Sequence, residues 1–448
     1  MKRWQGSKDL LFDAIEETTN LVERTHASVA RRSFRPLTAI EPLAPWARTV
    51  QAVHDAIAAG SYAGVRAASH GVGKLLDAGS GLVASELLDP AAAAPSDAQA
   101  SRARLIDNVE GAVNGFWGDY LSQQQNDLDL GMSLRHEGQV LPVERVALAR
   151  AYPGASPKLA VFIHGLSSTE WSWRSSAERF HGDPDVTYGS LLQADLGYTP
   201  LYVRYNSGQH VSHNSRLLSA LLAQLVAEYP VAVEEIALIG HSMGGLVARS
   251  AAHHGQSNNE PWVRYLRHIF CLGTPNLGAP LEQSVNLLTS VLGAVDLAGT
   301  QVPAQVLNTR SAGIKDLRFG YTLDEEWQGK DPDALLKNYR QDVPLVDGVG
   351  YYFVAATLTE DPAHPLGLLL GDLLVRPPSA AGQAAQPARR IPFHAGQTFN
   401  GLNHFHLTNH PDVYAVIRQC IELSEPATDD ADCADVVSST RGVVPADR

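Results

Sequence analysis

The sequence has few cysteines and no long apolar run. Its 448 residues include only Cys271, Cys420 and Cys433, which are odd in number and far apart, so we expect no disulfide framework. No stretch of about eighteen consecutive apolar residues occurs, so we expect no membrane-spanning helix. The first ten residues lack the apolar centre and the small-residue cleavage site of a secretory signal. The expected location is therefore cytoplasmic.

Basic residues are also in the minority. The chain has 35 lysines and arginines against 48 aspartates and glutamates, which gives a formal net charge of −13. A nucleic-acid binder needs a basic face, so this balance argues against nucleic acid as a partner. With 44% hydrophobic residues, the chain can bury a full core, and we expect one large domain with an appendage.

The first hundred residues are expected to form the appendage. Apolar residues between 11 and 29 recur at steps of three and four, as in a helix, and an Ala/Gly-rich helical stretch runs from about 49 to 88. The Pro/Ala-rich segment 89–100 is interpreted as a linker that ends a helical region 1–100. We interpret these helices as a layer packed on the following domain or in a dimer. The alternative is a region that settles on lipid or on a hydrophobic particle.

From residue 159 onward, apolar strands alternate with amphipathic helices. This order predicts an α/β fold, with a mostly parallel sheet and helices on both of its faces. Function in such folds gathers at the carboxyl ends of the strands. Before this region, alternating apolar residues in 132–136 and 144–149 predict a hairpin.

This second domain is expected to span residues 101–423. Within it, the run from about 279 to 350 does not follow a simple strand and helix rhythm, and we interpret it as an insertion that caps the site. The acidic segment 424–448 is rich in Ser, Ala and Asp and is expected to be a disordered tail.

The strongest motif is Gly-His-Ser-Met-Gly, residues 240–244. A strand-like apolar run ends there and a helix-like run starts at Gly245, which is the setting that a nucleophile elbow requires. A direct turn from strand into helix strains the serine, so its flanks cannot carry Cβ atoms that would clash. Ser242 is therefore the candidate nucleophile. A tight turn that merely contains serine is the alternative, and the strand and helix flanks argue against it.

A serine hydroxyl needs a base that is oriented by a carboxylate. In enzymes whose nucleophile lies in such an elbow, the acid follows the serine in the chain and the histidine comes last. For the acid we predict Asp372, because the apolar residues after it would bury it; the alternatives are Asp342, Asp347 and Asp361. For the base we predict His404, in a loop after the last expected strand; the neighbouring histidines are His394, His406 and His410.

The spacing of His404, His406 and His410 could also suit a metal. No Cys or carboxylate cluster joins these histidines, so we expect no metal site.

A tetrahedral intermediate would also need two N–H donors. The backbone amide of Met243 is the first candidate, and that of Leu166 is the second because Gly165 lets the backbone turn inward. His164 has the wrong chain order for the base and is interpreted as a brace of this oxyanion loop. Aromatic and aliphatic residues suit an apolar acyl chain; the candidates for contact with substrate are Trp171, Trp173, Tyr205 and Leu277.

Five segments carry a family resemblance: 162–165, 240–247, 272–279, 371–375 and 404–411. Together they resemble the lipase-like branch of the α/β-hydrolases, and most closely bacterial proteins similar to the hydrolase domain of GPI inositol-deacylase. The resemblance covers about residues 130–423. It implies ester hydrolysis by Ser242, Asp372 and His404, and it needs no metal or organic cofactor. Leu373 departs from it, since relatives usually have Gly-Asp-Gly-Leu-Val around the acid.

The leading hypothesis is a serine esterase or lipase that acts on a small-molecule or lipid ester. An acyltransferase or thioesterase would use the same three residues, and a peptidase or amidase is less favoured. From a different class comes a scaffold protein whose first hundred residues coat a lipid or polymer particle. The sequence does not indicate the oligomeric state.

Overall fold

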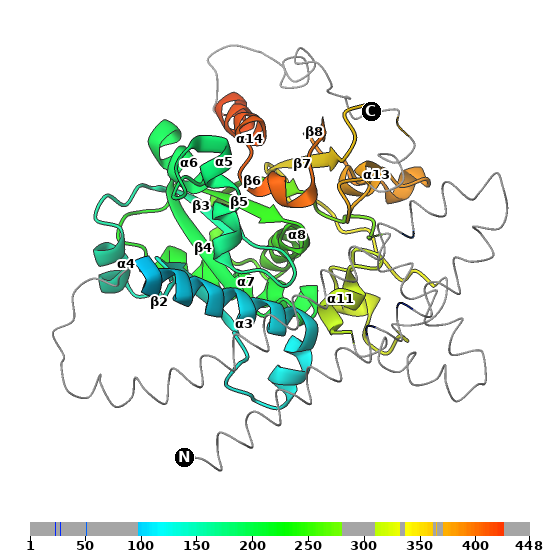
Figure 1. Ribbon diagram of the computed structural model, residues 1–448, viewed down its shortest axis with the longest axis horizontal. Coiled ribbons are helices and arrows are strands. Elements are labelled where there is room, and N and C mark those ends of the chain that lie inside the picture. Colours follow the sequence, from blue (N-terminus) through cyan, green and yellow to red (C-terminus); the bar gives the residue numbers. More distant parts are fainter. Residues whose placement is uncertain are drawn as a thin grey trace. The chain divides into compact units, whose positions relative to one another are not determined.

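The computed structural model describes residues 97–279, 310–331, 337–361, 364 and 371–424, together with residues 23, 27 and 51 (Figure 1). By their contacts, residues divide into two units: 1–109 with 289–309, and 110–288 with 310–448. Most of the expected appendage, much of the insertion and the tail lie outside the described residues. The segment interpreted as a linker overlaps helix α3, which begins at Asp97.

In the described part of the chain, eight strands form one sheet. They are β1 (Met132–His136), β2 (Gln139–Leu141), β3 (Lys158–Ile163), β4 (Thr199–Tyr205), β5 (Glu235–His241), β6 (Leu266–Leu272), β7 (Gly350–Thr357) and β8 (Ala395–Asn400). Their order is β2-β1-β4-β3-β5-β6-β7-β8. Strand β1 pairs antiparallel with β2 and β4, and the other neighbours are parallel. The predicted mostly parallel sheet is confirmed.

Helices cover both faces of this sheet. The described α-helices are α3 (Asp97–Gln123), α4 (Arg145–Ala151), α5 (Ala177–His181), α6 (Tyr188–Leu196), α7 (Val211–Glu228), α8 (Met243–Ser257), α11 (Ala312–Asp316), α13 (Pro377–Ala380) and α14 (Pro411–Ser424). Short 3-10 helices are η2 (Glu170–Arg174), η3 (Pro261–Tyr265), η4 (Asp324–Glu326), η5 (Pro387–Arg389) and η6 (His404–Thr408). Helices α7 and α8 lie on one face, and α6 and α14 on the other (Figure 1). None of the described helices is long and apolar enough to cross a membrane.

Strand β3 shows how the two faces are filled. Leu159, Val161 and Ile163 join the cluster that contains α7 and α8. Ala160 and Phe162 point the other way and join the cluster that contains α6 and α14. Side chains alternate along a strand, so burial on both faces needs the continuous apolar run that the sequence has here.

The predicted hairpin is wrong in its second arm. The turn is made by Glu137 and Gly138, whose φ angles are 50° and 79°, and β2 follows at once. Positive φ at both central residues is typical of a two-residue hairpin turn, which leaves no room for a longer connection. Residues 144–149 lie mostly in helix α4, where Leu148 is buried and Val146 is 81% exposed. Short alternating runs rich in Ala and Arg suit a helix equally well.

A buried ion pair ties β4 to the segment after β3. Arg204 donates from Nε to Glu170 Oε2 at 2.6 Å and from Nη2 to Oε1 at 2.5 Å. The two side chains are 1% and 6% exposed. Two parallel bonds of this kind fix the geometry of both groups. Removal of either partner would leave the other buried charge without its ion-pair partner.

We therefore expect Glu170→Ala to lower the free energy of unfolding by about 3 to 5 kcal/mol, as measured by urea denaturation. The matched control is Asp185→Ala, which breaks the exposed pair with Arg174 and is expected to cost less than about 1 kcal/mol. Equal losses in the two variants would contradict the role given to the buried pair.

Candidate functional site

Ser242 lies in a strained turn between β5 and α8. Its backbone angles are φ 54° and ψ −123°. A Cβ at Gly240 would lie 2.4 Å from the Gly245 nitrogen, and one at Gly244 would lie 2.2 Å from the carbonyl oxygen of Ile163. The turn therefore needs glycine on both sides of the serine, and the strand and helix around it are those that the sequence predicts.

His404 and Asp372 form a buried pair. His404, at the start of η6, places its Nδ1 2.7 Å from Asp372 Oδ2. The other carboxylate oxygen accepts hydrogen bonds from the backbone amides of Leu374 (3.0 Å) and Val375 (2.8 Å). Both partners are 1% exposed. Asp342, one of the alternative acids, is 57% exposed and pairs with Arg340 instead.

This pairing leaves the second ring nitrogen of His404 available. When Nδ1–H donates to the carboxylate, Nε2 of a neutral imidazole is an acceptor. Nε2 is buried and has no hydrogen-bond partner among the described residues. The arrangement of a carboxylate, an oriented imidazole and an open acceptor nitrogen is that of a general base.

Two residues next to the elbow hold His404 in place. His241 Nε2 lies 3.0 Å from the carbonyl oxygen of His404, and the two rings are 4.7 Å apart. Gly273 has φ 59°, and a Cβ there would lie 3.0 Å from His404 Cε1. The amide of Ser242 donates to the carbonyl of Leu272 at 2.8 Å, which joins the elbow to the residue before Gly273. Sequence reasoning did not find His241 or Gly273 as site residues.

The loop after β3 lies directly against the elbow. A Cβ at Gly165 would be 3.0 Å from Ser242 Cβ, so a larger residue there would be tight against the serine. Leu166 follows Gly165 in the chain. Met243 is the first residue of α8, and the first amides of a helix have no partner within it. The two predicted amide donors are thus carried by segments that meet at Ser242, and their role stays a prediction.

Comparison with known proteins places this chain in a family. Residues 160–417, more than half of the chain, match the model of the alpha/beta hydrolase family. The chain belongs to the α/β-hydrolase family. A search of curated protein sequences returns no match.

Three of the solved structures to which this chain is similar are a lipase, a phospholipase and a thioesterase domain. The mature lipase BlEst2 of Bacillus licheniformis is 18% identical, with a TM-score of 0.38, and the match covers 60% of this chain and 94% of that one. Phospholipase PlaB of Legionella pneumophila is 16% identical, with a TM-score of 0.34 and coverage of 60% and 56%. The NocB thioesterase domain is 14% identical, with a TM-score of 0.30 and coverage of 60% and 96%. Identities this low do not indicate a substrate.

The other histidines near the C-terminal end of this α/β-hydrolase have partners of their own. His394 Nδ1 accepts a hydrogen bond from the amide of Tyr351, and His410 Nδ1 accepts one from the amide of Asp412 at the start of α14. His406 Nε2 lies 3.2 Å from the side-chain nitrogen of Asn403. In the described ranges, no group of three or more His, Cys, Asp or Glu side chains could hold a metal ion.

Leu373, which departs from the Gly-Asp-Gly-Leu-Val pattern, has a backbone angle typical of glycine. Its φ is 101°, a value that residues with a Cβ rarely adopt. The carboxylate of Asp372 and the Leu374 amide close the turn around it. A leucine in this conformation introduces strain into the turn.

His164 holds the loop after β3 as a neutral ring. Its Nδ1 lies 2.8 Å from the carbonyl oxygen of Gly165, and its Nε2 accepts a hydrogen bond from the amide of Tyr205 at 3.2 Å. The Tyr205 ring stacks on the imidazole at 4.3 Å. Burial lowers the pKa of His164 to about 3. Nδ1 therefore carries the proton and donates it to the loop.

The four residues predicted to contact substrate have different surroundings. Tyr205 is fully buried against His164, and Trp173 is fully buried with its edge against Phe162. Trp171 and Leu277 keep part of their surface exposed. The first two are thus core residues in this structure, while contact with substrate stays a prediction for all four.

Stability should fall in acid because two histidines are buried as neutral rings. Burial lowers the pKa of His164 to about 3 and that of His241 well below its usual value. The unfolded chain takes up these protons near pH 6.5, so it is favoured as the pH falls below that value. By pH 5 the His164 ring should cost about 2 kcal/mol, and the His241 ring acts in the same direction.

The measurement is urea unfolding at pH 7 and pH 5, with His164→Asn as the comparison, since asparagine can replace the Nδ1 donor and does not titrate. The variant should lose about 2 kcal/mol less than the wild type between the two pH values. An identical pH dependence would show that His164 is not the neutral ring described.

A glycine at Leu373 should stabilise the protein. Relief of the strain, about 1 to 3 kcal/mol, exceeds the added chain entropy of glycine, about 0.5 to 1 kcal/mol. We expect Leu373→Gly to raise Tm by about 2 °C or more in a thermal melt. Leu374→Gly is the control, since its φ is not positive, and it should lower Tm. A lower Tm for both variants would contradict the backbone strain inferred at Leu373.

Proposed function

We propose that this α/β-hydrolase cleaves carboxylic esters as a serine esterase or lipase. The observation that carries the proposal is the buried pair of His404 and Asp372, whose open Nε2 belongs to a ring held by the residue just before Ser242. The strained turn supports Ser242 as the nucleophile, because strain of this kind is kept where the surrounding structure requires it.

The proposed reaction has two halves. Ser242 Oγ attacks the ester carbonyl carbon while His404 Nε2 takes the hydroxyl proton, and Asp372 stabilises the imidazolium that forms. The amides of Leu166 and Met243 hold the negative oxygen of the tetrahedral intermediate. The alcohol then leaves with the proton from His404. Water, activated by the same histidine, attacks the acyl-enzyme and releases the acid.

For the substrate we propose an ester with an apolar acyl chain, from a small molecule or a lipid. Trp171 and Leu277 support this, because both are apolar and partly exposed. We also propose that the protein is related to bacterial proteins similar to the hydrolase domain of GPI inositol-deacylase, and that it is located in the cytoplasm.

The test is labelling with a fluorophosphonate probe together with turnover of p-nitrophenyl esters of increasing chain length. Ser242→Ala should abolish both signals. Asp372→Asn should lower kcat on the order of 10⁴-fold, because the base loses its orientation and its counter-charge. Asp342→Asn is the matched control and should keep wild-type kcat, since this carboxylate is exposed and bonded to Arg340.

Three results would overturn the proposal. They are labelling at a residue other than Ser242, turnover that survives Ser242→Ala, and equal effects of the two Asp→Asn variants. The acyl chain length of the fastest substrate would indicate the length of the acyl-binding site.

A further inference from the structure

We propose that Ser207 is a positioning residue for the oxyanion loop, and that the insertion segment 311–316 holds Ser207 in place. This inference rests on the proposed function, in which the Leu166 amide binds the oxyanion. Ser207 lies outside every sequence motif and directly after a residue that packs on helix α3. The steps below follow the contacts outward from Leu166.

The first contact fixes the residue after Leu166. Ser167 has φ 57°, in the left-handed region, and its amide donates to Ser207 Oγ at 2.9 Å. Ser207 is 1% exposed, so water cannot replace this acceptor easily. A non-glycine residue in this conformation is held by its surroundings. The hydroxyl of Ser207 therefore sets the direction of the turn that carries Leu166.

Helix α3 closes the outer side of this turn. A Cβ at Gly115 would lie 2.0 Å from Ser167 Oγ and 2.7 Å from its Cα. A Cβ at Gly111 would lie 2.7 Å from Thr169 Cγ2. The backbone of α3 is thus in direct contact with the oxyanion loop, and the loop cannot swing away from Ser242 on this side.

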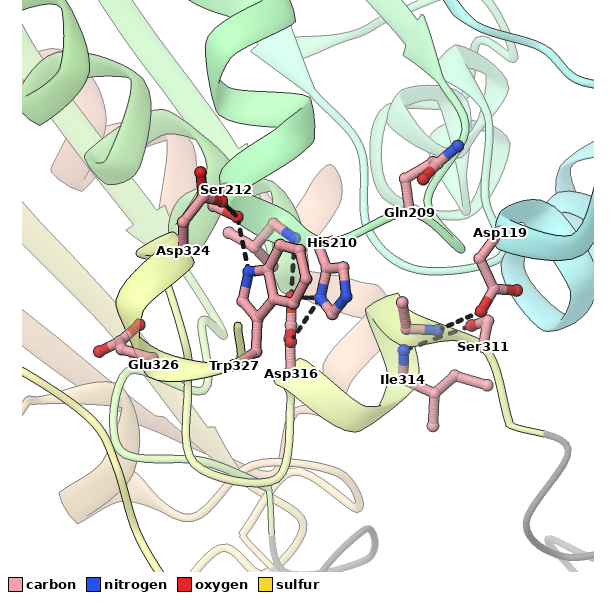
Figure 2. Close-up of polar contacts among 12 residues, drawn as sticks. Asp119, Gln209, His210, Ser212, Ser311, Ile314, Asp316, Asp324, Glu326 and Trp327 are labelled. Atoms are coloured by element: carbon pink, nitrogen blue, oxygen red, sulfur yellow. Dashed lines mark hydrogen bonds and ion pairs between the residues drawn. The ribbon is translucent and has the colours of Figure 1, made fainter. Parts of the chain in front are cut away.

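The insertion attaches to α3 at the same place. Ser311 Oγ donates to the carbonyl oxygen of Gly115 at 2.6 Å. The amide of Ala312 donates to Asp119 Oδ2 at 3.0 Å (Figure 2). Gly115 is also the residue that contacts Ser167, so insertion and oxyanion loop share one position on the helix.

The next residue of the insertion reaches the loop of Ser207. The amide of Gly313 donates to the carbonyl oxygen of Gly208 at 2.9 Å. A Cβ at Gly313 would lie 2.1 Å from the carbonyl oxygen of Ser207 and 2.9 Å from that of Gln209. The segment 311–316 therefore connects α3 to the loop between β4 and α7. It lies in direct contact with the backbone of Ser207.

Asp316 fixes the far end of this bridge. Its buried carboxylate accepts a hydrogen bond from the Val211 amide at 2.8 Å and lies 3.0 Å from His210 Nδ1 (Figure 2). A carboxylate at the first amides of a helix is favourable both as a cap and towards the helix dipole. The His210 ring stacks on Trp327 at 3.6 Å. The connection from Ser207 to α7 is thus held at both ends.

Ser212 offers a matched control. It lies in the first turn of α7 and also anchors the insertion by its hydroxyl, which donates to Asp324 Oδ1 at 2.6 Å and accepts from Trp327 Nε1 at 3.0 Å (Figure 2). These contacts do not involve Ser167, and Trp327 reaches the connection after Ser207 only by stacking on His210. If Ser207 had only a structural role, Ser207→Ala and Ser212→Ala should have the same kind of effect.

The experiment compares Ser207→Ala, Ser207→Thr and Ser212→Ala in the full chain, with kcat and KM for the best p-nitrophenyl ester and Tm for each. Ser207→Ala should lower kcat about tenfold with KM within about twofold, because the oxyanion forms only in the transition state. Ser207→Thr keeps the hydroxyl and should restore most of kcat. Ser212→Ala should lower Tm and leave kcat unchanged.

Wild-type kcat in Ser207→Ala, no rescue by threonine, or an equal fall of kcat in Ser212→Ala would each overturn the inference. If Ser207→Ala does not fold, Ser311→Ala tests the other end of the bridge: kcat should fall several-fold at constant KM, and unchanged kcat would refute it. Turnover that survives Ser242→Ala would instead refute the proposed function. Serine-dependent turnover with unaffected Ser207→Ala refutes this inference alone.

Discussion

The close approach of three backbone segments at Ser242 is the constraint on which the rest of this site depends. The end of β3, the turn after β5 and the start of α8 come so near to one another that no Cβ fits at Gly240 or Gly244, and one at Gly165 would be tight. Such contact is possible because β3 and β5 are adjacent parallel strands whose carboxyl ends lie side by side. The same packing forces the serine into its unusual conformation. The stability of the surrounding sheet offsets the free-energy cost of this strain.

Backbone atoms of His404 also help to hold it in place. The amide of His404 donates to the carbonyl oxygen of Asp372, and its carbonyl oxygen faces His241 Nε2. The carboxylate of Asp372 is in turn bound by two amides of its own turn. None of these bonds involves the side chain at position 373. This explains how the turn tolerates leucine at position 373, where the φ angle would suit glycine.

Much of this arrangement could be predicted from the sequence, because the decisive signals are local. The run from strand through Gly240, Ser242 and Gly244 into helix needs only a few consecutive residues, and it fixes the elbow. The pairing of Asp372 with His404 was expected from chain order. The second arm of the hairpin was missed because Val146 and Leu148 alternate as a strand would, while only Leu148 is buried in α4.

The contacts of Ser207, His241 and Gly273 could not be predicted. They join positions that are far apart in the sequence, so no spacing within the chain reveals them. The same holds for the glycines of α3, because only the structure shows Gly111 and Gly115 in contact with the loop after β3.

The place of the Asp372 and His404 pair late in the chain has a consequence for synthesis. During translation, β3, β5 and the elbow leave the ribosome before β7, β8 and η6 exist. A nascent chain that ends before residue 371 therefore has the serine and neither member of the pair. The proposed nucleophile is synthesised well before the base that we propose for it. Reactivity towards esters would begin only when β8 has joined the sheet and η6 has packed beside it.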